Sequence, residues 1–155
     1  MLTEIKKEKK DFEVKEGDIL IVDLGETKEK GIQGGERPVL VYSNNKNNKY
    51  SPSIEVITIT SQMKALHLPI NVVLETYETG LPVRSVAQVN QKEVISKEKI
   101  KYKIGELKSQ YKRDKIVDAI MIQNPIIYES ITRRIKRKYN NYNKSINTTF
   151  LQPSM

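Results

Sequence analysis

The sequence predicts a mainly β protein of the α+β class, in which a small, strongly bent sheet or barrel carries a helix packed alongside. Short β-branched segments alternate with polar turns up to residue 95, and the hydrophobic period changes to that of a helix near residue 109. The chain has 155 residues, which is enough for one domain with its own core.

Six segments have the β-branched or aliphatic composition of strands and are bounded by polar or glycine-containing stretches. These expected strands cover residues 19–24, 38–43, 54–60, 71–75, 85–89 and 93–95. The stretches 25–33, 44–53 and 61–69 have no helical apolar stripe, so we expect loops there, with a turn at 80–82. The first loop has nine residues, which is long for a hairpin connection and typical of a functional loop.

Two helices are expected after the strands. The first covers residues 109–123, with Ser109 as its N-cap. Its expected core face is Tyr111, Ile116, Val117, Ile120 and Met121, and its expected outer face is Lys112, Arg113, Lys115 and Asp118. Asn124 and Pro125 end this helix and start another, because Asn is a good cap and Pro a good first helical residue.

The second helix is basic and amphipathic. Ile127, Ile131 and Ile135 repeat every four residues beside five Lys and Arg residues between 133 and 138. Such a helix suits packing on its own domain, on a partner protein or on RNA, and packing on the domain is the preferred interpretation. Residues 140–155 are rich in Asn, Ser and Thr, so we expect them to be disordered.

The net charge of +8 is concentrated near the C-terminal end. Residues 1–16 are neutral, residues 17–128 carry +3, and residues 129–155 carry +5. We therefore predict three parts: a charged N-terminal extension (1–14), a folded domain (15–128) and a basic, partly disordered extension (129–155). A basic tail suits nucleic-acid binding, although a purely solubilising tail is the more common case.

Composition excludes several kinds of chemistry. The sequence has no Cys, which excludes disulfides, thiolate catalysis and Cys-ligated metal sites. His67 is the single histidine, so no histidine pair or cluster can form. There is no Gly-x-Ser-x-Gly elbow, Walker loop or dinucleotide fingerprint. We expect no metal and no cofactor, and an enzyme that works with arginine, hydroxyls, amides and a carboxylate.

The sequence also lacks membrane and export signals. No apolar run approaches the ~20 residues that a membrane span needs, and the first ten residues have no apolar segment. We therefore expect a cytoplasmic protein without a membrane partner.

The most informative segment is Gln33-Gly34-Gly35-Glu36-Arg37-Pro38, which precedes the apolar run 39–41. The glycine pair permits positive φ or a close backbone approach. Pro38 pushes Arg37 toward an extended conformation. The arginine is thus fixed at the start of a strand, as a phosphate-binding arginine would be. An ordinary surface arginine after a turn explains these residues equally well.

A wider set of motifs surrounds this segment. They are Gly17-Asp18-Ile19, Asp23-Leu24, Gln33 to Val41, Asn44, Ser51-Pro52, Ile59-Thr60-Ser61-Gln62, Leu68-Pro69 and Ser85-Val86. In this order and spacing they resemble the MazF/PemK toxins, which are sequence-specific endoribonucleases (mRNA interferases) of type II toxin–antitoxin systems. The likeness runs from about residue 15 to 125 and leaves out both terminal extensions.

The resemblance implies an SH3-like (PemK/CcdB-type) β-barrel with a packed C-terminal helix. It also implies a homodimer, single-stranded RNA lying across the dimer, and a cognate antitoxin that covers the RNA groove. The family cleaves RNA without metal and leaves a cyclic phosphate and a 5′-hydroxyl.

Arg37 and Thr60 match the family's catalytic arginine and threonine. Taken without Arg37, Thr60 is better explained as a strand-edge threonine with high β-propensity, and the general base stays open. Eleven further residues lie at or near positions that bind RNA in the family. They are Gln33, Gly34, Ser43, Asn44, Ser61, Gln62, His67, Leu68, Pro69, Ser85 and Gln91.

One departure from the family affects specificity. Many members have a glutamate immediately before the Gln of the glycine pair, and Ile32 stands there in this chain. The RNA sequence that is cut therefore cannot be transferred. The alternative function is a non-catalytic barrel of the same fold that binds a protein partner, as the gyrase-poisoning toxins do, or nucleic acid.

Overall fold

The computed structural model describes residues 12–27, 29, 30, 32 and 34–150, apart from the side chain of Phe150. The strands are β1 (Asp18–Asp23), β2 (Glu36–Val41), β3 (Ser53–Thr60), β4 (Asn71–Leu74), β5 (Ser85–Ser96) and β6 (Ile100–Glu106). The helices are α1 (Asn45–Tyr50), α2 (Thr76–Thr79), the 3-10 helix η1 (Lys97–Lys99), α3 (Gln110–Gln123) and α4 (Pro125–Phe150).

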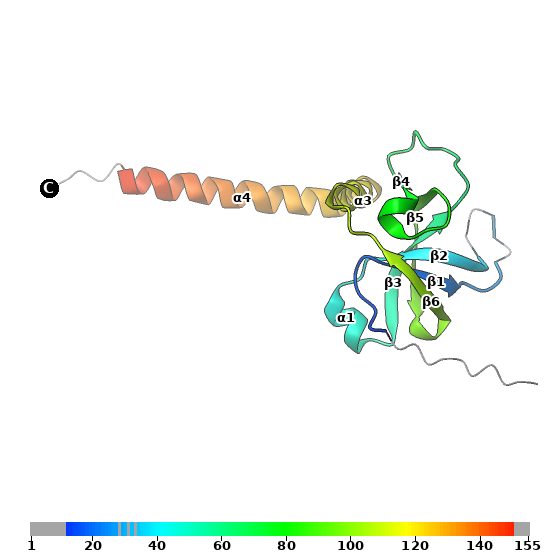
Figure 1. The fold of residues 1–155 in the computed structure, drawn as a ribbon. Coiled ribbons are helices and arrows are strands. Elements are labelled where there is room, and N and C mark those ends of the chain that lie inside the picture. Colours follow the sequence, from blue (N-terminus) through cyan, green and yellow to red (C-terminus); the bar gives the residue numbers. More distant parts are fainter. Residues whose placement is uncertain (1–11, 28, 31, 33, 151–155) are drawn as a thin grey trace, which may run out of the picture.

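The strands form one bent antiparallel sheet in the order β4-β5-β3-β2-β1-β6, with α3 packed on β4 and β5 (Figure 1). This arrangement confirms the predicted class, a mainly β α+β fold with a packed C-terminal helix. The core has two parts because side chains alternate across the sheet. Ile19 and Leu40 lie in the cluster that includes α3, whereas Leu20 and Val39 lie in the cluster on the other face.

The structure differs from the prediction in the last two strands. The segments expected at 85–89 and 93–95 are parts of one strand, β5. The polar stretch between them lies where the pairing of β5 with β3 shifts register, between Ile57 and Thr58. Strand β6 was not predicted. Most of its side chains are exposed, and it pairs with β1 through the backbone, so its sequence has no apolar pattern.

Helix α3 presents the predicted core face only in part. Ile116 is buried and Ile120 packs on the core, as predicted, but Tyr111 and Val117 are more than half exposed. Lys112, expected to point outward, instead donates from Nζ to the carbonyl of Val73 at 2.5 Å. Long cationic side chains can place their stems on apolar surface while their heads bind carbonyl groups, so an apolar count assigned Lys112 to the wrong face.

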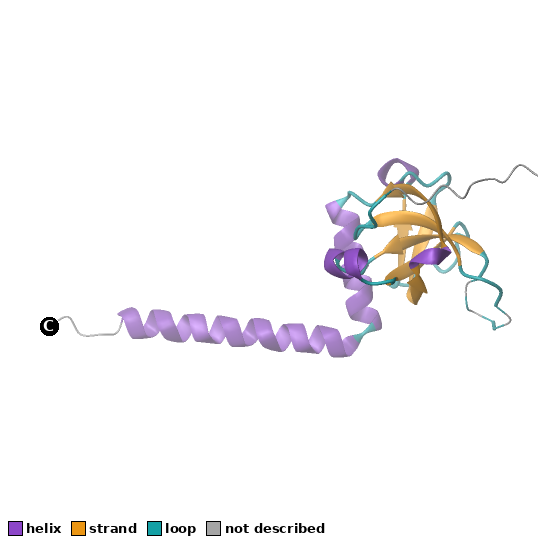
Figure 2. Cartoon of the chain, turned by 90° about the horizontal axis from the view of Figure 1, so that it is seen from below, coloured by secondary structure: helices purple, strands orange, loops and turns teal. Residues whose placement is uncertain are grey.

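Helix α4 differs most from the prediction. It extends away from the barrel as a straight rod and contacts α3 (Figures 1 and 2). It therefore does not pack on the domain, and it continues through residues 140–150, where we expected disorder. Thr148 and Thr149 donate their hydroxyls to the carbonyls four residues earlier, which suits a helix. In the described part of the chain, no helix is both long and apolar enough to cross a membrane.

Helix α1 lies within the expected loop 44–53 and is fastened by a buried network. Asn48 Nδ2 donates to the carbonyl of Ser43 at 2.8 Å, and the Ser43 hydroxyl donates to Asn48 Oδ1. The amide of Glu55 in β3 donates to the same hydroxyl at 3.0 Å. Ser43 and Asn48 are 5% and 1% exposed. Ser43 thus joins α1 to β3, and because its hydroxyl already donates to Asn48 and accepts from the amide of Glu55, these bonds argue against the predicted contact with RNA.

This network predicts that Asn48→Ala destabilises the barrel. The substitution leaves a buried hydroxyl and carbonyl without their partners, which costs about 2–3 kcal/mol. Urea denaturation measures this loss in the free energy of unfolding. Asn140→Ala, at an exposed position of α4, is the control and should change it by less than about 0.5 kcal/mol. Equal stabilities for the two variants would contradict the structural role of the network.

Candidate active site

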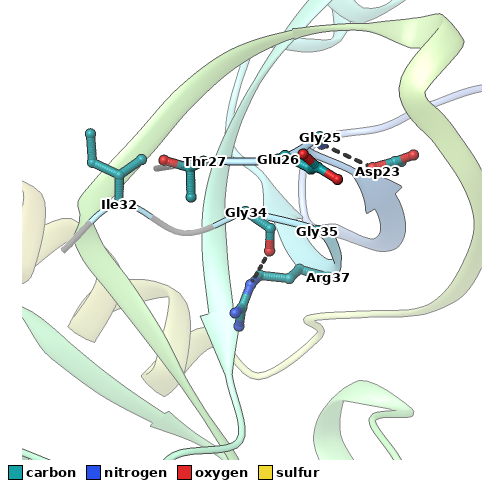
Figure 3. A pocket seen from close by; sticks show the side chains of 8 residues that line it. All are labelled: Asp23, Gly25, Glu26, Thr27, Ile32, Gly34, Gly35 and Arg37. Carbon is teal, nitrogen blue, oxygen red and sulfur yellow. Dashed lines mark hydrogen bonds between the residues drawn. The ribbon is translucent and has the colours of Figure 1, made fainter. Parts of the chain in front are cut away.

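The loop between β1 and β2 borders an open pocket of about 540 Å³ that contains Arg37 (Figure 3). The lining residues are Asp23, Gly25, Glu26, Thr27, Ile32, Gly34, Gly35 and Arg37. All of them come from the end of β1, the loop and the start of β2. One continuous hairpin therefore builds the pocket.

Backbone hydrogen bonds close the base of this loop. The amide of Leu24 donates to the carbonyl of Gly35 at 2.9 Å, and the amide of Gly35 donates to the carbonyl of Gly25 at 2.6 Å. Gly35 has a φ of +75°, which disfavours a side chain. At Gly34, an added Cβ would lie 2.7 Å from the methyl carbon of Thr27. The glycine pair thus allows the tight turn and the close approach that the sequence predicted, and Gly34 has a structural role.

The turn also orients Arg37. Its Nε donates to the carbonyl of Gly34 at 2.6 Å, and the residue is half-buried. No described residue accepts a hydrogen bond from its two terminal nitrogens. In Figure 3 the guanidinium lies below the glycine pair, and its two terminal nitrogens point away from the loop. The neighbouring backbone therefore fixes the cation and leaves its outer edge available for an anion.

Thr60 lies at the end of the adjacent strand. The β2–β3 pairing ends at Val39, which is opposite Thr58. Extending the same register by two residues aligns Arg37 with Thr60 beyond the last paired residues. The two predicted catalytic residues therefore come from the same end of two neighbouring strands, β2 supplying the arginine and β3 the threonine.

The Thr60 hydroxyl is less open than a surface residue. The side chain is buried, with 5% of the residue exposed, and Oγ1 accepts a hydrogen bond from the amide of Gln62 at 3.2 Å. The hydroxyl keeps its own hydrogen for donation to a ligand.

Several predicted RNA-binding residues are exposed beside this end of the sheet. Ser61 and Gln62 directly follow Thr60, and His67, Leu68 and Pro69 lie farther along the same β3–β4 loop. The last three line a second pocket of about 340 Å³ together with residues of α3. Those α3 residues are Tyr111, Lys112, Lys115, Asp118 and Ile122. These α3 residues were not predicted to lie near the β3–β4 loop, because Tyr111 was expected in the core.

Other described residues predicted to bind RNA do not line the Arg37 pocket, and several of them have structural roles. Ser43 and Asn44 follow the far end of β2 from Arg37, and Asn44 caps α1 by accepting the amide of Asn47. Ser85 is 2% exposed and donates to the carbonyl of Val83, so its burial argues against a contact with RNA. Gln91 lies at the register shift of β5. Gln33 lies outside the described residues.

The pocket also contains two carboxylates that sequence reasoning did not single out. Asp23 accepts the amide of Gly25 through Oδ1 at 2.9 Å, which ties it to the loop. Glu26 is exposed and lines the same pocket (Figure 3). Ile32 contributes apolar surface to the same pocket and is 45% exposed. The loop sequence has no periodic pattern, and its carboxylates could be assigned to the pocket only from its folded path.

Among the residues that the structure describes, no group of three or more His, Asp or Glu side chains is arranged to hold a metal ion.

Comparison with known proteins agrees with this geometry. Residues 15–123 match the family described as "PemK-like, MazF-like toxin of type II toxin-antitoxin system". Endoribonuclease EndoA of Bacillus subtilis (strain 168) is 34% identical over 114 residues, covering 74% of this chain and 97% of that protein.

Solved structures show the same fold. MazF from Deinococcus radiodurans has a TM-score of 0.61 at 18% identity, covering 73% of this chain and 97% of that one. A mycobacterial endoribonuclease in complex with its cognate antitoxin has a TM-score of 0.55 at 20% identity, covering 71% and 91%. Helix α4 begins beyond the matched residues 15–123. The family inferred from the motifs is thus confirmed, and this chain belongs to the PemK-like, MazF-like toxins of type II toxin–antitoxin systems.

Proposed function

We propose that this chain is a toxin endoribonuclease that cleaves single-stranded RNA at a short sequence motif without a metal ion. The observation that carries the proposal is Arg37 itself, oriented by the Gly34 carbonyl in an open pocket, on a strand that pairs with the strand ending at Thr60. Membership of the toxin family and the 34% identity to an endoribonuclease support it further. The substrate motif stays open because Ile32 occupies the position of the family's usual acidic residue.

The proposed reaction is an internal transfer within the RNA. The ribose 2′-oxygen attacks the adjacent phosphorus, and the bond from phosphorus to the 5′-oxygen breaks. The products are a 2′,3′-cyclic phosphate and a 5′-hydroxyl. The 2′-hydroxyl proton passes to a base, and the departing 5′-oxygen takes up a proton. No oxidant or further reactant is consumed.

Arg37 has the central role because negative charge grows on the phosphoryl oxygens during attack. A guanidinium offers two terminal nitrogens in a planar fork that matches two such oxygens. Its orientation is set in advance by the hydrogen bond to the Gly34 carbonyl, so little reorganisation is needed during the reaction. Thr60 adds a short hydroxyl donor from the neighbouring strand.

We assign the base to Glu26. It is an exposed carboxylate in the pocket that holds Arg37, whereas Asp23 is bound to the loop backbone. A carboxylate is a weak base at neutral pH, but positioned proton transfer still contributes about 10²–10⁴-fold to such reactions.

The surfaces around the pocket are proposed to bind RNA bases and protein partners. We propose that the exposed loop residues Gln62, His67 and Leu68 contact splayed bases through an amide, a ring and apolar surface. We also propose that the active form is a homodimer and that a cognate antitoxin covers the RNA groove. A related endoribonuclease has been solved in complex with its cognate antitoxin.

The alternative is a barrel of the same fold that binds RNA or a protein partner without chemistry. Incubating purified protein with a long single-stranded RNA in EDTA separates the two functions. The proposal predicts discrete fragments that carry cyclic phosphates and free 5′-hydroxyls. RNA that is bound but intact under these conditions would favour the alternative.

Arg37→Ala should lower the rate of RNA cleavage by about 10²–10³-fold, because it removes the preorganised donor for the phosphoryl oxygens. Arg37→Lys keeps the charge but loses the fork, and should recover only part of the activity. Single-turnover cleavage with a fluorescent RNA measures both rates, and urea denaturation verifies that both variants are folded. Full activity in folded Arg37→Ala would remove the catalytic assignment.

Thr60→Ala should slow cleavage by roughly tenfold, since one hydrogen bond to the transition state is lost. Thr60→Ser keeps the hydroxyl and is the matched control, so its rate should stay near that of the parent protein. Equal losses in the two variants would assign Thr60 to packing.

Glu26→Gln should lower the cleavage rate by at least about 10²-fold if its carboxylate takes the 2′-hydroxyl proton. Glu29→Gln, an exposed carboxylate of the same loop outside the pocket lining, is the control and should be neutral. Equal cleavage rates in Glu26→Gln and Glu29→Gln would exclude Glu26 as the base.

A further inference from the structure

Helix α4 is long and has little support from the rest of the chain. It has 26 residues, which correspond to about 39 Å at the helical rise of 1.5 Å per residue. Its main contacts with other elements are to α3, at the end where α4 begins (Figure 2). Most helices in proteins are stabilised by packing of an apolar face rather than by propensity. A helix of this length whose main contacts lie near its start therefore suggests a ligand along the rest of its length.

The polar surface of α4 is strongly cationic. Residues 125–150 contain six Lys and Arg and one Glu. All six cationic side chains are exposed, and no described carboxylate lies within ion-pairing distance of any of them. Arg133, Arg137 and Lys144 are spaced by four and seven residues, so they lie along one stripe of the helix. An anionic ligand is the electrostatic complement of this stripe.

The other side of α4 is apolar and aromatic. Tyr128, Tyr139 and Tyr142 are 55%, 63% and 64% exposed, and Ile131 and Ile135 are 40% and 62% exposed. A ligand that fits the whole helix needs negative charge and flat apolar surface together. Single-stranded RNA has both, because its bases are unpaired and stack on aromatic rings while its phosphates bind Lys and Arg. A duplex hides its base faces, and a second copy of α4 has the same positive charge.

We propose that α4 is a second RNA-binding surface of this protein, which holds single-stranded RNA outside the pocket of Arg37. The inference rests on the proposed function, which supplies RNA as the ligand. Figures 1 and 2 place α4 on the opposite side of the barrel from the β1–β2 loop. A short RNA at the pocket does not reach α4, whereas a long flexible strand contacts both. Binding to α4 raises the local concentration of long RNA at the barrel.

The test compares two variants of the full chain with the same change in charge. Arg133→Gln/Arg137→Gln removes two cations of the α4 stripe. Lys49→Gln/Lys99→Gln removes two exposed lysines that flank the end of β3 farthest from Thr60. The probe is a long single-stranded RNA with 2′-O-methyl groups, which has no attacking hydroxyl. Its Kd is measured by fluorescence anisotropy over a series of salt concentrations.

The α4 variant should bind the long RNA more weakly, and its slope of log affinity against log salt should be shallower by about 1.4, for two lost phosphate contacts. The lysine control should keep the parent slope. Cleavage of a short RNA should be unchanged in both variants. Tyr139→Ala/Tyr142→Ala should weaken binding of single-stranded RNA more than binding of an RNA duplex, since stacking needs unpaired bases.

Two results would overturn the proposal. One is an equal Kd and slope for the α4 variant and the lysine control. The other is a loss seen on phosphatidylglycerol vesicles, or in self-association measured by sedimentation, but not on RNA. These outcomes are independent of catalysis, because the probe is not cleaved. Failure of the proposed function would instead appear as intact unmethylated RNA with binding to α4 preserved.

Discussion

The antiparallel pairing of β2 with β3 is the constraint on which the rest of the account depends. Val39 and Val56 are buried in one hydrophobic cluster and Leu40 and Ile57 in the other, so both faces of this pairing are buried. A slip of one residue would move every side chain of a strand to the opposite face. The hydrophobic core therefore fixes the register of residues 39–41 against 56–58, and with it the relative position of the strand ends that carry Arg37 and Thr60. Packing in the centre of the barrel thus determines which polar groups lie at this end of the two strands.

The β1–β2 loop converts this register into a site. Gly34 leaves room for the Thr27 methyl and Gly35 supplies the positive φ of the turn, and the Gly34 carbonyl holds the Arg37 side chain by its Nε. A cation positioned in this way is available for a phosphate before the substrate arrives, which is the condition for electrostatic catalysis. The same loop brings Glu26 into the pocket. The β1–β2 hairpin and the neighbouring strand β3 therefore supply all the residues of the proposed catalytic site.

The sequence predicted the parts of the molecule in which local and tertiary preferences agree. The central strands, the glycine pair and the placement of Arg37 were visible because β-branched runs and glycines have strong local preferences. Strand β6 was missed because its exposed side chains leave only backbone pairing as a signal. The roles of Ser43 and Ser85 could not be read, since burial depends on elements distant in sequence. The length and direction of α4 could not be predicted. Its sequence pattern indicates an amphipathic helix, but no local pattern tells whether its apolar face packs on the domain.

A structure of this protein with a 2′-O-methylated single-stranded RNA would test the central claim most directly. The account predicts that one phosphate of the RNA lies between β2 and β3, with a terminal nitrogen of Arg37 and the Oγ1 of Thr60 both within hydrogen-bonding distance of its oxygens. A contradicting result would be an RNA whose phosphates lie elsewhere on the barrel. In that structure Arg37 would bond only to the Gly34 carbonyl, and Thr60 would be covered by its neighbours.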